Sequence, residues 1–402
     1  MKRRGLTLAL SLTLAGASAL ASCSTQGQDD GGASSLSNET SSSTPAEATP
    51  TSTSPASPTQ SSTASPTQSA QDRVPEELRA KAASLMVVGV TDFDTALQAL
   101  ELGVGGIFVP SWADSSIFTE PGRDIAALRE RIDRPFSVSI DFEGGRVQRH
   151  TNVFGEWPSP RVMTQGTPEE VRGMGYDMGT SLREHGVTVD FAPLLDVDVA
   201  GLDIVGDRAF GTDAQTVATY GAAFAQGLVD AGVTPTYKHF PGHGQASGDT
   251  HLGEAITPPL AELEQLDLVP YTMALTEVPE ASVMVGHMVV PGLGDGQTPS
   301  TLNPAAYELL RSGKYPGGTP FDGLVVTDDM SGMRAISDRM GTAEAVTAAI
   351  SAGADQVLWS TGDSIEASIN QVVGAVEAGE IPQERIDEAA LRVQQQYLHE
   401  GL

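Results

Sequence analysis

Short runs of apolar, largely β-branched residues recur from residue 74 onward, and longer amphipathic segments separate them. These runs predict eight strands, at 85–90, 106–109, 136–140, 187–191, 233–237, 282–286, 323–327 and 355–359. They are nearly continuously apolar, which is typical of parallel strands buried on both faces. Helical patterns lie between and after them, at 95–103, 168–186, 214–232, 364–378 and 382–399. The first three helical segments end on a glycine, the usual residue where a helix closes in a left-handed turn.

Eight strands that alternate with helices favour an α/β fold of the (β/α)8 TIM-barrel type, and a doubly wound open sheet is the alternative. Polar residues directly follow the predicted strands: Asp141, Glu143, Asp196, Asp198, Lys238, His239, His287, Asp328 and Asp329. In a barrel these side chains converge on one mouth, whereas an open sheet spreads them along an edge. Their placement favours the barrel, which we expect to form one domain over residues 73–402.

The N-terminal segment 1–22 has the layout of a secretory signal peptide. Lys2, Arg3 and Arg4 precede an apolar run that ends in the sequence Leu-Ala-Ser-Cys at Cys23. That ending resembles the bacterial lipobox, in which the cysteine is lipidated after the preceding residues are removed. A transmembrane anchor is the alternative, but the run is shorter than the roughly 20 residues that a span needs. We therefore expect a lipid anchor on Cys23 that holds the protein at the extracytoplasmic face of the cell membrane.

Residues 23–72 predict a disordered tether between this anchor and the folded domain. From Ser24 to Asp72 the chain is rich in Ser, Thr and Pro and contains no aromatic residue, lysine or arginine. Such a segment buries too little apolar surface to offset its conformational entropy. Cys23 is the only cysteine, so an intramolecular disulfide and a thiolate metal cluster are both excluded.

The charge balance excludes one large class of function. Lys and Arg number 23 against 52 Asp and Glu, a formal net charge of −29. A nucleic-acid binder needs a basic face against phosphates, so we expect no nucleic-acid partner. The composition does not set the oligomeric state, and we expect a monomer from a single domain on a tether.

Three segments carry the candidate chemistry. The densest is Lys-His-Phe-Pro-Gly-His-Gly over 238–244, followed after four residues by Asp249, Thr250 and His251. It holds three histidines of a chain that has seven. The other two are Ile-Asp-Phe-Glu-Gly-Gly-Arg-Val-Gln-Arg over 140–149 and Leu-Val-Val-Thr-Asp-Asp-Met-Ser over 324–331.

These segments resemble glycoside hydrolase family 3, specifically its single-domain bacterial β-N-acetylglucosaminidases (β-hexosaminidases), over about residues 75–402. The resemblance implies a (β/α)8 catalytic domain, a retaining mechanism and release of terminal, non-reducing β-linked N-acetylglucosamine, often from peptidoglycan fragments (muropeptides). It implies no cofactor and no metal. By motif position, Asp328 matches the nucleophile and His251 the general acid/base, with Asp249 as its partner. The residues that match the sugar-binding set are Asp141, Arg149, Arg208, Lys238 and His239.

The residue types themselves support these roles. Glycoside cleavage passes through an oxocarbenium-like transition state and usually needs an ionised carboxylate and a proton donor. Asp328, at the end of a strand, suits the first task. An imidazole titrates near neutral pH, and Asp249, two residues before His251, can orient that ring. We interpret Glu143, His243 and Asp329 as structural residues of their loops and His287 as a site-lining or core histidine.

Three alternatives stay open at this point. The first is a metal-dependent hydrolase that uses His239, His243, Asp249 and His251, although Pro241 and Gly242 argue against a zinc-binding helix there. The second is a non-catalytic lipoprotein that binds cell-wall sugar. The third is an N-acetylglucosaminide phosphorylase, because a histidine acid/base tolerates an incoming anion better than a carboxylate does.

Overall fold

A computed structural model describes residues 69–402, so the signal segment, Cys23 and nearly all of the predicted tether lie outside the described residues. The first helix, α1 (Ala70–Arg73), includes three residues that the sequence analysis assigned to the tether. The Arg73 side chain donates a hydrogen bond of 2.6 Å to the carbonyl of Leu402 at the other end of the chain. Within residues 69–402, every helix is too short or too polar to cross a lipid bilayer.

Eight parallel strands form the centre of the described region, one for each run that the sequence predicts. They are β1 (Met86–Gly89), β2 (Gly106–Phe108), β3 (Ser137–Ile140), β6 (Val189–Asp190), β7 (Thr234–Phe240), β8 (Ser282–Val285), β9 (Val325–Thr327) and β10 (Val357–Trp359). Their order in the sheet is β10-β1-β2-β3-β6-β7-β8-β9, which is sequence order after one cyclic shift. A separate antiparallel hairpin, β4 (Phe142–Gly144) with β5 (Val147–Gln148), follows β3.

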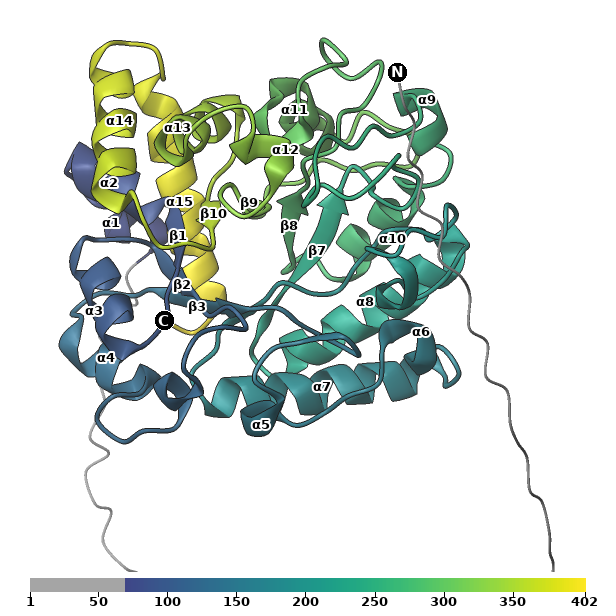
Figure 1. Cartoon of the computed structure of the whole chain (residues 1–402), viewed down its shortest axis with the longest axis horizontal. Coiled ribbons are helices and arrows are strands. Elements are labelled where there is room, and N and C mark those ends of the chain that lie inside the picture. Colours follow the sequence, from purple (N-terminus) through teal and green to yellow (C-terminus); the bar gives the residue numbers. More distant parts are fainter. Residues whose placement is uncertain (1–68) are drawn as a thin grey trace, which may run out of the picture. The chain divides into compact units, whose positions relative to one another are not determined.

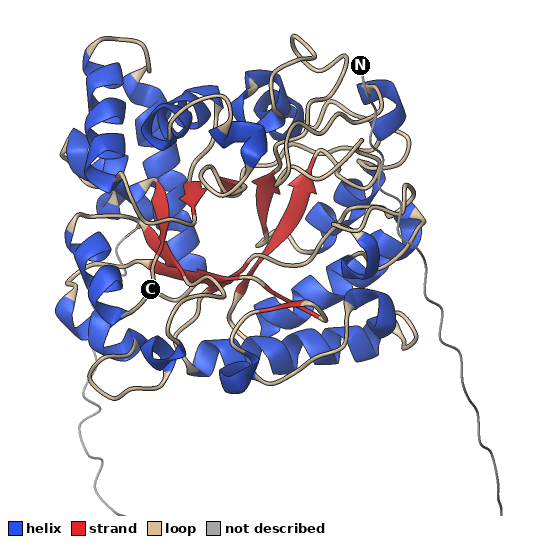
Figure 2. Ribbon diagram, in the orientation of Figure 1, coloured by secondary structure: helices blue, strands red, loops and turns tan. Residues whose placement is uncertain are grey.

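The sheet closes on itself. Strand β1 pairs with β10 through Met86–Val357 and the next two residues of each strand. Between β9 and β10, Val326 forms a parallel bridge with Gln356, and the backbone N–H of Thr327 donates to the Gln356 carbonyl at 3.1 Å. Figure 2 shows the strands as a ring inside a layer of helices. The (β/α)8 barrel is therefore confirmed, and the doubly wound alternative is wrong.

Helices surround the barrel on its outer face (Figure 1). They are, after α1, α2 (Leu78–Ser84), α3 (Phe93–Glu101), α4 (Ile125–Arg131), α5 (Thr151–Phe154), α6 (Pro160–Met163), α7 (Pro168–Glu184), α8 (Ala214–Asp230), α9 (Leu260–Leu263), α10 (Val269–Glu277), α11 (Pro304–Ser312), α12 (Arg334–Ser337), α13 (Thr342–Ala352), α14 (Ile365–Glu377) and α15 (Gln383–His399). Gly103, Gly186 and Gly232 follow α3, α7 and α8 with φ of +96°, +84° and +79°. The predicted left-handed helix ends are confirmed.

One buried carboxylate ties the outer helices to the amino-terminal end of the barrel. Asp355 precedes β10 and is fully buried. It forms ion pairs with Arg311 of α11 and with Arg385 and Arg392 of α15. Because the amino-terminal face of such barrels carries stability rather than chemistry, we assign this cluster a structural role.

Helices α7 and α8 lie side by side along one flank of the barrel (Figure 1) and approach each other at glycines. A β-carbon on Gly175 would lie 2.4 Å from the Phe224 carbonyl oxygen, and one on Gly227 would lie 2.2 Å from that of Arg172. Both distances are far inside van der Waals contact, so the two backbones pack this closely only with glycine at these positions.

We expect Gly175→Ala to lower the free energy of unfolding by about 1–3 kcal/mol, because the methyl group forces the helices apart. Gly173→Ala is the matched control. It lies in the same helix with no heavy atom within 4 Å of its β-carbon position, and it should raise that energy by about 0.5–1 kcal/mol through better helix propensity. Urea denaturation followed by circular dichroism measures both, and equal effects of the two variants would contradict the close-packing explanation.

Candidate active site

The carboxyl-terminal ends of the barrel strands surround a pocket of about 310 Å³. Seven of the eight residues that the sequence assigns to catalysis or sugar binding line it: Asp141, Arg149, Arg208, Lys238, His239, His251 and Asp328. Asp249 does not line the pocket, but its carboxylate contacts the His251 ring. The fold thus brings together the three motif segments and Arg208, which lie up to about 190 residues apart in the sequence. Active sites of such barrels form at this end of the strands.

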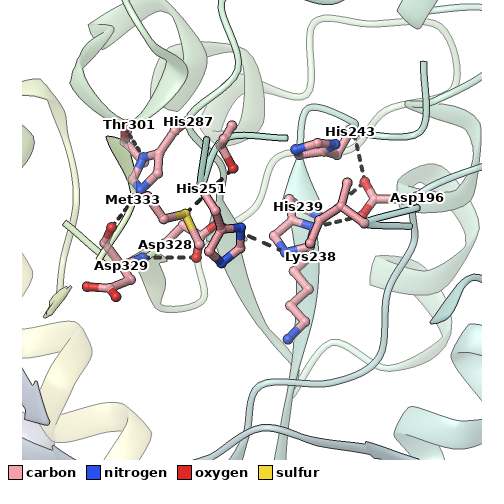
Figure 3. A network of polar contacts seen from close by, with 12 residues as sticks. Asp196, Lys238, His239, His243, His251, His287, Thr301, Asp328, Asp329 and Met333 are labelled. Atoms are coloured by element: carbon pink, nitrogen blue, oxygen red, sulfur yellow. Dashed lines mark hydrogen bonds and ion pairs between the residues drawn. The ribbon is translucent and has the colours of Figure 1, made fainter. Parts of the chain in front are cut away.

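Asp328 follows β9 and is only 6% exposed. One carboxylate oxygen accepts a 2.9 Å hydrogen bond from the Asp329 backbone N–H, and the other lies 4.0 Å from Nε2 of His239. In Figure 3 the imidazoles of His239, His251 and His287 lie around this carboxylate. Burial by itself would raise the pKa of Asp328, but the neighbouring His239 and the Asp329 N–H lower it below its usual value. The side chain is therefore ionised at neutral pH.

Asp196 orients the histidine that faces Asp328. It is fully buried, and its Oδ2 lies 2.6 Å from Nδ1 of His239. Its Oδ1 accepts the backbone N–H groups of His239 and His243 at 3.3 and 2.7 Å. Asp196 lies at a predicted strand end, and the sequence around it indicates no role for it. Its strand-end position was the available signal, but its partners are more than 40 residues away.

His287 is a buried histidine that braces the loop after β9. Its Nε2 lies 2.9 Å from the Asp329 carbonyl oxygen and its Nδ1 lies 2.8 Å from Oγ1 of Thr301. A carbonyl can only accept, so we assign the proton to Nε2, which leaves Nδ1 to accept from the Thr301 hydroxyl. Burial lowers the pKa of His287, in keeping with this neutral form.

The Asp329 side chain ties the same loop to the end of β10. Its carboxylate accepts from the backbone N–H and hydroxyl of Ser331 and from those of Ser360, at 2.5 to 3.0 Å. These bonds hold the backbone from which Asp328 projects, so the contacts agree with the supporting role predicted for Asp329.

A buried ion cluster forms one wall of the pocket. Glu143 on β4 is 1% exposed and binds Arg208 through two hydrogen bonds of 2.7 and 2.8 Å. Nζ of Lys238 on β7 lies 2.7 Å from Glu143 and 2.9 Å from Asp141. Burial would raise the pKa of Glu143, but Arg208 and Lys238 lower it to about 2. Glu143 is therefore more than a loop residue, because it holds two predicted sugar-binding cations in place.

The Arg149 side chain is less tightly held than the side chains of the ion cluster. Its side chain is 31% exposed, and one guanidinium nitrogen lies 4.0 Å from Oδ2 of Asp141. It remains free to donate to a bound molecule, and Asp141, 21% exposed, keeps acceptor capacity toward the pocket.

His251 is the exposed member of the site, with 48% of its side chain accessible. Its Nδ1 lies 2.8 Å from Oδ1 of Asp249, and its backbone N–H donates to the same oxygen at 2.8 Å. A carboxylate accepts only, so Nδ1 carries the proton in this contact and Nε2 is the nitrogen left for a bound molecule. The pairing of these two residues agrees with the sequence interpretation.

His243 also lines the pocket and is only 3% exposed. Among the described residues neither of its ring nitrogens has a hydrogen-bond partner. Burial lowers the pKa of His243, so the ring is neutral. Within residues 69–402, no three or more His, Cys, Asp or Glu side chains are arranged to hold a metal ion, His243 included.

Comparison with known proteins bears on what this site does. Residues 77–396 match the profile of the glycosyl hydrolase family 3 N-terminal domain. The chain belongs to glycosyl hydrolase family 3. It is 46% identical over 319 residues to the beta-hexosaminidase LpqI of Mycobacterium tuberculosis, and the match covers 78% of this chain and 81% of that protein.

Solved structures give the same assignment. A family 3 glycosyl hydrolase from Mycobacterium smegmatis superposes with a TM-score of 0.78 at 46% identity, over 81% of this chain and 98% of that one. A family 3 β-N-acetylglucosaminidase from Paenibacillus superposes with a TM-score of 0.75 at 31% identity, over 81% of this chain and 63% of that one. The predicted family is confirmed: this chain is an enzyme of the glycoside hydrolase class, and the findings support β-hexosaminidase activity.

The ion cluster predicts a pH-dependent stability. Because the pKa of Glu143 is depressed from 4.5 to about 2 in the folded protein, its contribution is complete above pH 4.5 and is lost as the pH falls toward 2. That contribution is about 3 kcal/mol. Glu143→Gln should therefore lower the free energy of unfolding at pH 7 by about 3–5 kcal/mol, since Lys238 and Arg208 lose their buried counter-charge. The difference in free energy of unfolding between Glu143→Gln and wild type should become smaller below pH 4.5. Urea denaturation at a series of pH values measures it.

Asp207→Asn is the matched control. Asp207 pairs with Arg146 at 2.7 Å, but both side chains are nearly half exposed. Its removal should change stability little at any pH. If Glu143→Gln changed stability as little as Asp207→Asn, the buried cluster would not make the contribution to stability that we assign to it.

Proposed function

We propose that this chain is a retaining, exo-acting β-N-acetylglucosaminidase that works through a covalent glycosyl-aspartate. The observation that carries the proposal is an ionised, buried Asp328 in the same pocket as a His251 whose ring is oriented by Asp249. The substrate class comes from two relatives, one named a beta-hexosaminidase and the other a β-N-acetylglucosaminidase.

The first half-reaction breaks the bond between C1 of the sugar and the leaving oxygen. A carboxylate oxygen of Asp328 attacks C1, and Nε2 of a protonated His251 gives its proton to the departing oxygen. In the second half-reaction neutral His251 takes a proton from water, whose oxygen attacks C1 and releases Asp328. The two inversions at C1 give net retention. His239 and the Asp329 N–H stabilise the Asp328 carboxylate when it departs.

The pocket suits the end of a sugar chain. Buried Met284 and Leu358 lie among its lining residues, so the apolar barrel core closes its floor. Its volume is near the lower end of the ~300–1,000 Å³ usual for small-ligand sites. Lys238 and Arg149 can donate to ring hydroxyls, and Asp141 can accept from them. A terminal sugar enters and the rest of the substrate stays outside, which is what exo-action requires.

We further propose that the substrate is a peptidoglycan fragment and that the protein acts as a monomer anchored at the outer face of the cell membrane. The lipobox-like sequence before Cys23 and the following Ser/Thr/Pro-rich segment support this location. Two or more acyl chains are needed for stable anchoring, which a lipidated N-terminal cysteine supplies.

Asp328→Asn should abolish release of nitrophenol from p-nitrophenyl N-acetyl-β-glucosaminide while the far-UV circular dichroism stays unchanged. Asp338→Asn, which removes an exposed surface carboxylate that pairs with Arg334, is the control and should keep full activity.

Wild-type rates should not depend on added phosphate, and proton NMR should show the β-anomer as the first product. Wild-type turnover in Asp328→Asn would disprove the nucleophile assignment, and sugar 1-phosphate as product would favour the phosphorylase.

His251→Ala should separate substrates by leaving group. We expect a loss of about 10²–10⁴-fold in kcat/KM for a disaccharide, whose leaving oxygen needs a proton, and a much smaller loss for 2,4-dinitrophenyl N-acetyl-β-glucosaminide. His185→Ala, whose ring bonds the Ser181 carbonyl on α7, is the control. An equal loss for good and poor leaving groups would contradict the proton-donor role.

Cys23→Ser should move the protein from the membrane fraction to the medium in a host that processes lipoproteins. Metabolic labelling with a fatty acid should mark the wild type and the neighbouring control variant Ser24→Ala but not Cys23→Ser. Labelling of Cys23→Ser would show that another residue carries the lipid.

A further inference from the structure

We propose that Trp112 is the platform on which the leaving-group sugar stacks, so that it sets the preference of the enzyme for saccharide over small leaving groups. This inference rests on the proposed function and extends it from the cleaved sugar to the next ring of the substrate.

Trp112 combines two properties that no other large apolar residue among the described ones shares. It lines the catalytic pocket, and it is 62% exposed. The other large apolar side chains that are exposed within residues 69–402 do not line this pocket: Val162, Tyr176, Val199, Leu252 and Ile256. Single exposed apolar residues are ordinary on protein surfaces. An indole at the rim of a catalytic pocket is a different case, because a bound substrate can cover it.

The loop that carries Trp112 is anchored on both sides of it. It follows β2, and the Pro110 carbonyl oxygen lies 2.9 Å from Nε2 of His150. The backbone N–H of Asp114 donates to the Thr91 carbonyl at 2.7 Å, and Ala113 is buried against the core. The indole is therefore exposed on a fixed backbone, so that little entropy is lost when a ligand packs on it.

The direction in which a bound substrate must extend leads toward the indole. Asp328 marks where C1 of the cleaved sugar lies, and the floor of the pocket is closed by buried Met284 and Leu358. With a ring on the floor, whatever is attached to the glycosidic oxygen must extend toward the rim. Trp112 is the large apolar surface that the described part of the chain offers there.

The chemistry of the rim differs from that of the pocket wall. Lys238 and Asp141 in the wall can exchange hydrogen bonds with hydroxyls. A pyranose ring also has an apolar face of C–H groups, and a large flat aromatic side chain buries such a face at small conformational cost. An indole can hold a neutral sugar of any substitution pattern in this way, so the platform selects for a ring rather than for particular hydroxyls.

The test compares two substrates that share the cleaved sugar. N,N′-diacetylchitobiose carries a second ring that reaches the rim, whereas β-N-acetylglucosaminyl fluoride has a one-atom leaving group that cannot. We expect Trp112→Ala to lower kcat/KM for the disaccharide about three- to tenfold and to leave kcat/KM for the fluoride unchanged. Trp112→Phe should recover most of the loss. Tyr176→Ala, which removes another exposed aromatic side chain, on α7 and outside the pocket, should change neither value.

Each other result overturns the inference in a recognisable way. Equal losses for both substrates would mean that Trp112 supports the fold of the site, and undiminished disaccharide cleavage would mean that the second ring does not contact it. If wild-type protein cleaved neither substrate, both the proposed function and the proposed role of Trp112 would be wrong. Activity of the wild type on the fluoride therefore separates the two failures.

Discussion

The site depends on one buried carboxylate. Glu143 lies behind the pocket wall and holds Lys238 and Arg208 at hydrogen-bond distance. Two cations this close and this buried would repel each other strongly without it, because the low-dielectric interior screens charge poorly. Its two partners come from the segment before α8 and from β7. One ionised side chain thus fixes the spacing of groups that the chain supplies from widely separated positions.

The barrel separates stability from chemistry along its axis. At the amino-terminal end, Asp355 gathers three arginines from the outer helices. At the carboxyl-terminal end, the polar residues that follow the strands face a pocket. Between them lie buried apolar strand residues, which keep water away from the floor of the site. A carboxylate such as Asp328 can stay ionised there only because histidines and a backbone N–H lie next to it.

The histidines around the pocket differ in their partners and hence in what they can do. His239 is held by Asp196, and His287 is locked between Thr301 and the Asp329 carbonyl. Both ring nitrogens of His287 are thus engaged, and Nε2 of His239 faces the proposed nucleophile Asp328 at 4.0 Å rather than a leaving oxygen. His251 is half exposed and has Nε2 unengaged, with Asp249 on its other nitrogen. The environment, rather than the residue type, therefore singles out His251 as the proposed acid/base.

Local sequence determined much of this protein. Apolar runs determined eight strands because burial on both faces requires them to be continuous. Glycines at 103, 186 and 232 determined helix ends because they adopt positive φ without strain. The motif segments also contain six of the predicted site residues that line the pocket, and Arg208 is the seventh.

Tertiary structure alone decided how these parts meet. The closure between β9 and β10, the bond from Asp196 to His239 and the double role of Glu143 join residues that are about 30 to 95 positions apart. The indole of Trp112 carries no periodic signal, so only its place on the rim distinguishes it from any surface tryptophan. Periodicity reports which face of an element is buried, but not which distant side chain it meets, because that depends on the path of the whole backbone.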